Sequence, residues 1–140
     1  YEIGVRLVGS EMCIRDRLDA ERMHEGAQRF VGTHDFASVR SQGTPVKSTV
    51  RTIFWCDVDK IDDLIRIRVC GDGFLYNMVR AISGTLVYVG GGKLRPDDVA
   101  DVLASCDREQ AGPTLPACGL FMNRLWYDHT SELDRFRLGD

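Results

Sequence analysis

The sequence predicts an α+β domain, in which an antiparallel or mixed sheet carries helices packed on one face. Two neighbouring segments, residues 49–58 and 64–70, are rich in β-branched residues or alternate apolar with charged residues, as strands do. Residues 75–89 repeat apolar side chains every three or four positions, as a helix does. The full order of helix, strand, strand, helix, helix, strand is typical of an α+β domain.

The composition is that of an ordinary folded domain. The 140 residues are 44% hydrophobic and 28% charged, and they contain no apolar run near the roughly 20 residues that span a bilayer. The net charge of -3 gives no global attraction for nucleic acid, although a local basic face remains open. The five cysteines and three histidines show no metal-ligand spacing. We therefore expect reduced thiols, no metal, no membrane and a cytoplasmic protein.

The chain is expected to contain one structured domain, over residues 18–127, followed by a polar tail over residues 128–140. Residues 1–17 show no clean apolar period, and residues 10–17 resemble translated sequencing-adapter read-through. We interpret residues 1–17 as an artefactual segment foreign to the domain. The alternative is a variable strand or tail.

The first structured element is expected to be a helix. Asp19 is a suitable N-cap, Met23, Ala27 and Phe30 give the helix an apolar face, and Gly32 is expected to end it. A turn over residues 34–40 and a loop over residues 41–48 should lead to the strands.

The two strand-like segments should pair with each other. Their connection, residues 59–63, is short and polar, which favours an antiparallel pair. Alternation places Ile65, Ile67 and Val69 on one face of the second strand. Arg66 and Arg68 fall on the opposite face, where they could hold phosphates or simply face solvent.

The central helix follows a glycine turn. Gly71 and Gly73 are expected to allow positive φ, and residues 90–92, all glycine, should stop the helix. Pro96 suits the first position of a second helix, which is expected over residues 97–105. A loop over residues 107–118 and a final strand over residues 119–127 complete the expected elements.

Arg80 is the most informative single residue. At about 100° per residue it falls in a strip with Asn77 and Gly84, away from the main apolar stripe. The helix is apolar nearly all round and should be buried, so Arg80 needs a partner, and its planar fork suits a carboxylate or phosphate. No acid of the chain is obviously placed to provide one. The alternative is an arginine that reaches solvent.

Three other motifs are weaker. Residues 90–93 (Gly-Gly-Gly-Lys) lack the spacing of a phosphate-binding loop. His34 and Asp35 could belong to a catalytic arrangement, but a turn with local backbone bonds is the better interpretation. Arg40, Lys47 and Arg51 belong to a stretch with four basic residues and one acid between residues 29 and 56, which suits phosphates or a solvated surface equally.

Five blocks of this chain together resemble the C-terminal half of the tRNA pseudouridine synthase A family. They are GTHDFASVR at residues 32–40, STVRTI at 48–53, FLYNMVR at 74–80, DREQAGPT at 107–114 and ACGLF at 117–121. The resemblance implies one half of the pseudouridine synthase fold, in a homodimeric isomerase that uses no cofactor. Such an enzyme converts uridine to pseudouridine in the anticodon stem-loop of tRNA.

The resemblance also implies roles for particular residues. Arg80 would pair with the catalytic aspartate and keep it ionised. Gly119 and Leu120 would line the pocket for the uracil base, and Arg40, Lys47 and Arg51 would contact RNA.

The family motif that carries the catalytic aspartate, Arg-Thr-Asp-x-Gly-Val-His-Ala, is absent from this sequence. We therefore expect this chain to be inactive alone. Two alternatives stay open: a non-catalytic RNA-binding or dimerisation module, and a generic α+β domain in which Arg80 is structural.

Overall fold

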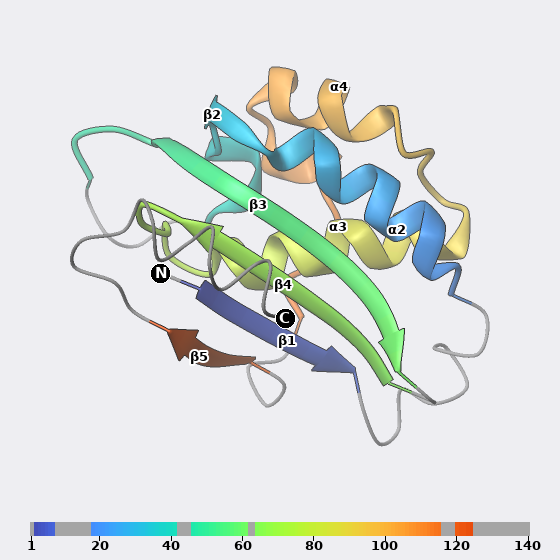
Figure 1. The fold of residues 1–140 in the computed structure, drawn as a ribbon. Coiled ribbons are helices and arrows are strands. Elements are labelled where there is room, and N and C mark those ends of the chain that lie inside the picture. The colour runs from blue at the N-terminus through green and yellow to red at the C-terminus, as the bar shows by residue number, and fades with distance from the viewer. Residues whose placement is uncertain (1, 8–17, 42–45, 62–63, 116–119, 125–140) are drawn as a thin grey trace.

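The computed structural model describes residues 2–7, 18–41, 46–61, 64–115 and 120–124 (Figure 1). The strands are β1 (Glu2–Leu7), β2 (Gly32–Asp35), β3 (Val50–Ile61), β4 (Leu64–Gly71) and β5 (Leu120–Arg124). The α-helices are α2 (Ala20–Ala27), α3 (Met78–Gly91) and α4 (Asp98–Ser105). Short 3₁₀ helices are η2 (Gln28–Phe30), η3 (Ala37–Val39) and η4 (Arg108–Gln110).

The described strands form one five-stranded sheet in the order β2-β3-β4-β1-β5, with every neighbouring pair antiparallel. Helices α2 and α3 lie along the same face of this sheet (Figure 1). The core lies between these layers, where Met23, Ile67, Ile82 and Leu86 are fully buried. The predicted α+β class, with helices on one face, is therefore confirmed.

The register of β3 and β4 explains how the sheet separates its two faces. A bulge falls between Ile53, which pairs with Gly71, and Trp55, which pairs with Cys70. The extra residue shifts the alternation of β3 by one, so that Cys56 and Val58, like Ile53, are buried with the core.

The other face of β3 and β4 carries paired charges. Arg66 donates two hydrogen bonds to Asp59, at 3.0 and 2.7 Å, and Arg68 lies 3.7 Å from Asp57. The Arg68 guanidinium also lies 5.4 Å from the Trp55 ring centroid. Arg66 and Arg68 therefore lie on the face opposite the core, as predicted, but carboxylates of β3 already pair with both of them.

Side chains of α2 and η2 cover the part of the β3 edge that extends beyond β2. The Gln28 amide donates to the carbonyl of Cys56 at 2.9 Å, and the Val58 N–H donates to Nδ1 of His24 at 3.1 Å. Backbone groups on a strand edge need such partners when they are buried. The start of α2 is capped as predicted, since the Asp19 carboxylate accepts from the N–H groups of Glu21 and Arg22.

Two strands were not predicted. Residues 32–35 were assigned to a helix end and a turn, but they form β2, because the free edge of β3 provides the backbone partners that this short segment lacks locally. Gly32 opens β2 with φ of +110° instead of ending α2. Before Leu18, Glu2–Leu7 form the strand β1 between β4 and β5, whereas the interpretation of residues 1–17 as foreign to the domain stays a prediction.

The start of α3 also differs from the prediction. Among the described glycines only Gly32 and Gly92 have positive φ, so the expectation for Gly71 and Gly73 is wrong. Gly71 is needed for space, because a Cβ there would lie 2.8 Å from the carbonyl oxygen of Thr52. The left-handed residue is instead Asn77, at φ 57°, immediately before Met78.

The rest of the helical layer follows the prediction closely. Helix α3 ends at a left-handed Gly92, and α4 buries Val99, Val102 and Leu103 as expected. The expected final strand is found over the shorter range of β5, while residues 116–119 and 125–140 lie outside the described part. Among the described residues, no helix has the length and apolarity needed to cross a membrane.

Thiol reactivity should report the packing of the described cysteines. Cys56 and Cys70 are buried and Cys106 is exposed. Burial, reinforced by the negative charge of Asp57, raises the pKa of the Cys56 thiol far above its ordinary value. We predict that iodoacetamide modifies Cys106 of the native chain much faster than Cys56 or Cys70, as measured by peptide mass spectrometry. Equal rates in the native chain would contradict the packing, and Cys106→Ser is the control for site assignment.

Candidate functional site

Arg80 lies in the first turn of α3 and is held by neutral groups. Its Nε donates to the Leu115 carbonyl at 2.5 Å, and its Nη1 donates to Oδ1 of Asn77 at 2.8 Å. The Leu115 N–H in turn donates to the Arg80 carbonyl at 3.2 Å. Among the described residues no carboxylate forms a salt bridge with Arg80. The guanidinium is therefore oriented while its charge is left without a described counter-ion.

Asn77 links Arg80 to the loop that follows η3. Its Nδ2 donates to Oγ of Ser41 at 3.1 Å, while its Oδ1 accepts from Arg80. The Ser41 N–H also donates to the carbonyl of Tyr76 at 2.9 Å. Asn tolerates the left-handed conformation better than most residues with a Cβ, which suits it to this position. The residue thus turns the chain into α3 and supports Arg80 at the same time.

Arg80 and Gly84, two members of the predicted strip, both contact the segment formed by residues 112–115. A Cβ added at Gly84 would overlap the carbonyl oxygen of Pro113 and lie 2.8 Å from its carbonyl carbon. Residues 112–115 therefore run against the backbone of α3, contacting it at Gly84 and at Arg80. The sequence predicted the strip but not the segment that covers it.

Two of the three predicted basic residues lie beside the turn that leads into α3. Arg40 directly precedes Ser41, and Arg51 is close enough to Gly73 that a Cβ there would lie 3.7 Å from Nε of Arg51. Nη1 of Arg51 also donates to the carbonyls of Ser48 and Val50, at 2.9 and 2.7 Å. Lys47 is exposed in the preceding loop.

The predicted base-pocket residues are only partly described. Leu120 begins β5, which pairs with β1 at the opposite side of the sheet from β2. Gly119 lies outside the described residues. Their proposed role next to the base therefore stays a prediction.

His34 and Asp35 form local bonds, as their second interpretation predicted. A ring nitrogen of His34, Nε2, lies 2.9 Å from the Val31 carbonyl oxygen, and Asp35 accepts from the Ala37 N–H at 3.0 Å and from the Thr49 hydroxyl at 2.5 Å. Within the described ranges no three His, Cys, Asp or Glu residues are grouped as metal ligands.

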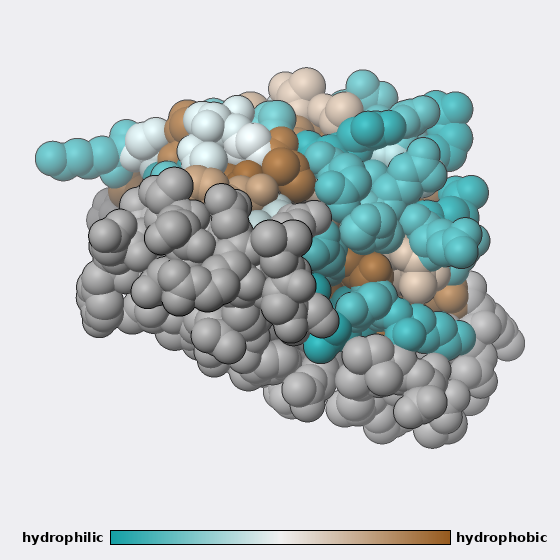
Figure 2. Space-filling model, in the orientation of Figure 1, coloured by the Kyte–Doolittle hydropathy of each residue, from teal (hydrophilic) through white to brown (hydrophobic). Residues whose placement is uncertain are grey.

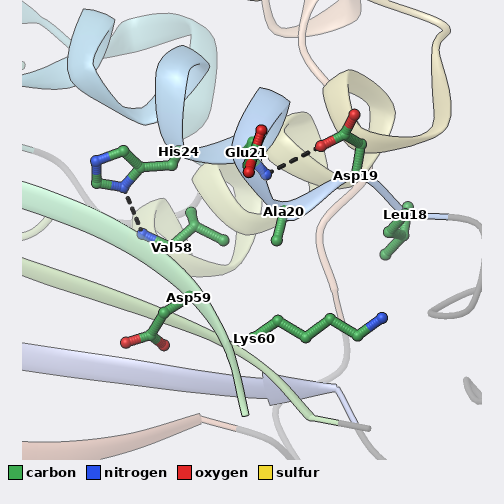
Figure 3. Close-up of a pocket in the computed structure, with 8 residues that line it drawn as sticks. All are labelled: Leu18, Asp19, Ala20, Glu21, His24, Val58, Asp59 and Lys60. Atoms are coloured by element: carbon green, nitrogen blue, oxygen red, sulfur yellow. Dashed lines mark hydrogen bonds between the residues drawn. The ribbon is translucent and has the colours of Figure 1, made fainter. Parts of the chain in front are cut away.

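A separate cavity of about 620 Å³ opens between the start of α2 and the end of β3 (Figure 3). In this region of the surface, hydrophilic residues surround a hollow in which hydrophobic residues are visible (Figure 2). His24 and Asp19 line it, but both already bind backbone N–H groups. The Asp19 N–H donates to the Gly90 carbonyl at the far end of α3, which is about 15 Å along the helix from Arg80. This cavity is therefore not part of the Arg80 site.

The fold and the site together define an α+β domain that presents an oriented arginine beside a basic loop. Residues 27–128 match a family model described as tRNA pseudouridine synthase. The chain belongs to the tRNA pseudouridine synthase family.

Three curated relatives illustrate the similarity. The chain is 44% identical over 114 residues to the tRNA pseudouridine synthase A of Acetivibrio thermocellus, and this match covers 81% of the chain and 47% of the relative. It is 48% identical over 114 residues to that of Brevibacillus brevis, with the same coverage. For Bacillus subtilis the identity is 45% over 113 residues, covering 81% of the chain and 46% of the relative. The chain thus spans about half the length of the relatives it matches.

The backbone contact at Gly84 can be tested by its effect on stability. We predict that Gly84→Ala lowers the free energy of unfolding by about 3 kcal/mol, because the new methyl group must displace the backbone of Pro113. Gly91→Ala is the matched control in the same helix, since its Cβ would lie 3.9 Å from Leu18. The control should change stability by less than about 1 kcal/mol. Urea unfolding measures both, and equal effects would contradict the contact.

Proposed function

We propose that this chain is the arginine-bearing half of a tRNA pseudouridine synthase, which isomerises uridine to pseudouridine in the anticodon stem-loop of tRNA. The observation that carries the proposal is the state of Arg80, which is oriented by Leu115 and Asn77 without a carboxylate partner among the described residues. The names of the curated relatives support the activity and the tRNA substrate.

In the proposed mechanism, Arg80 acts on an aspartate that the resemblance places in the other half of the full-length protein. A guanidinium beside a carboxylate lowers the carboxylate pKa, which keeps the aspartate ionised for its reaction at C1′ of the uridine. Because Nε and Nη1 are already fixed by neutral acceptors, the guanidinium retains its positive charge for that pairing.

The basic residues beside the site are proposed to hold the RNA backbone. Arg40 directly precedes Ser41, which accepts a hydrogen bond from Asn77 at the start of α3, while Lys47 precedes β3 and Arg51 lies near its start. Phosphate contacts of this kind orient an RNA by its shape and charge instead of by its sequence. Arg66 and Arg68 are less suited to this role, because Asp59 and Asp57 already pair with them.

Gly119 and Leu120 are proposed to line the base pocket, as the resemblance implies. The full-length protein is further proposed to act as a cytoplasmic homodimer without a cofactor.

Substitutions in the full-length protein should separate chemistry from binding. We predict that Arg80→Ala lowers kcat for pseudouridine formation by at least about 100-fold, because it removes an electrostatic partner from the reacting site. The Kd for tRNA should change by less than about threefold. Arg80→Lys should recover little, because lysine lacks the planar fork.

Lys47→Ala is the comparison variant for that experiment, because it removes one exposed charge from the residues proposed to contact RNA. It should leave kcat unchanged and lower the slope of log affinity against log salt concentration by about 1. Pseudouridine is measured by mass spectrometry of tRNA digests, and binding by filter retention. Full activity of Arg80→Ala would overturn the proposed role of Arg80.

The 140-residue chain alone should form no pseudouridine, because the proposed catalytic aspartate is not in its sequence. The assay uses unmodified anticodon stem-loop RNA with the full-length protein as the positive control. Turnover by the chain alone would show that a residue of this half drives the reaction.

A further inference from the structure

We propose that residues 108–115, here called the strap, position the Arg80 guanidinium for the reaction, with Thr85 and Arg108 as positioning residues. This inference rests on the proposed function of Arg80. Leu115 contacts Arg80 twice, since its carbonyl accepts from Nε and its N–H donates to the Arg80 carbonyl. A displacement of Leu115 would therefore move the side chain of Arg80 and disturb the backbone of its helical turn.

The first anchor of the strap is a buried hydroxyl on α3. The Gly112 N–H donates to Oγ1 of Thr85 at 2.9 Å, and this hydroxyl donates to the Ala81 carbonyl at 2.8 Å. Thr85 is fully buried, so the bond to Gly112 is not readily replaced by water. The hydroxyl thus ties the strap to the helix one turn beyond Arg80.

The second anchor is the close approach of two backbones. A Cβ at Gly112 would overlap the Gly84 carbonyl oxygen and lie 2.6 Å from the Thr85 nitrogen. Glycine at both positions therefore lets the strap lie directly on α3. Neither glycine has positive φ, so each is required for space and not for its conformation.

The third anchor is the fork of Arg108. Its Nη1 donates to the Gly112 carbonyl at 2.6 Å, and its Nη2 donates to the Thr114 hydroxyl at 2.8 Å. One planar group therefore sets the spacing of Gly112 and Thr114, just before Leu115. Thr85 and Gly84 thus hold the strap against α3, while the Arg108 fork fixes the shape of the strap itself.

This arrangement orients Arg80 without neutralising it. A carboxylate in the place of the Leu115 carbonyl would hold the guanidinium equally well but would compensate its charge. A carbonyl fixed by Thr85, Gly84 and Arg108 preserves the charge and limits its movement. Pre-set geometry of this kind matters because a displacement of about 1 Å can cost about 100-fold in rate.

The test uses Thr85→Val and Arg108→Ala in the full-length protein, with Thr85→Ser as the matched control that keeps the hydroxyl. We expect each of the first two variants to lower kcat by about 10- to 100-fold and to leave KM within about twofold. Thr85→Ser should stay close to the wild type. Arg108→Lys should rescue poorly, because one ammonium does not reproduce the fork.

Two further readouts distinguish positioning from a general loss of structure. In an Arg80→Ala background, Thr85→Val should have no additional effect on the residual rate, whereas a merely structural role would lower it again. The second readout is the ¹⁵N spectrum of the full-length protein, in which the Arg80 Nε–H signal is assigned by its loss in Arg80→Lys. The hydrogen on Nε should exchange slowly with water in the wild type and faster in Thr85→Val.

The outcomes separate this inference from the proposed function. Full activity of Arg80→Ala would overturn the proposed function, while the Nε–H exchange would still test whether the strap holds Arg80. If Arg80→Ala is inactive but Thr85→Val and Arg108→Ala keep full activity and slow exchange, the strap does not position Arg80. A fall in activity with unchanged Nε–H exchange would overturn the inference as well.

Discussion

The hydrogen bond from Nε of Arg80 to the Leu115 carbonyl joins the two requirements of this domain. Helix α3 is buried against the sheet and α2, so a charged side chain on it must find polar partners. A neutral carbonyl satisfies that need without adding an opposite charge. Residues 112–115 provide this carbonyl, and Gly84 and Gly112 let the segment lie against α3. Asn77, at the turn into α3, accepts a second hydrogen bond from Arg80.

The sheet provides the frame that keeps α3 in place. Ile65, Ile67 and Val69 of β4 face the helices. The bulge before Trp55 shifts the alternation of β3, so that its core residues face the same side as those of β4. The opposite face neutralises its own arginines with Asp57 and Asp59. Arg66 and Arg68 are thus paired with carboxylates of the same sheet, whereas Arg80 forms no salt bridge with a described carboxylate. This contrast supports the role proposed for Arg80.

The sequence predicted the features that depend on local pattern. Periodicity located α3, α4, β3 and β4 and placed Arg80 in one strip with Asn77 and Gly84. It missed β2, whose four residues become a strand only through the edge of β3, and β1, whose partners lie at least 58 residues away. It also missed the contacts of Thr85 and Leu115 with residues 80 and 112, because these bonds join segments that are distant in the sequence. Gly84 and Gly112 can be read from the sequence, but the close backbone contact that requires glycine at both positions cannot.

In the proposed enzyme, Arg80 and the catalytic aspartate belong to different halves of the protein. This arrangement explains why neutral hydrogen-bond partners suit Arg80. If Arg80 were oriented only by the catalytic aspartate, its geometry would depend on the docking of the other half. Here the orientation is set by Leu115 and Asn77, both within this chain. In the proposed enzyme, the aspartate therefore meets a guanidinium that is already aimed and still fully charged. Such preorganisation concentrates the electrostatic benefit on the reacting state, because little reorganisation is left to be done when the uridine binds.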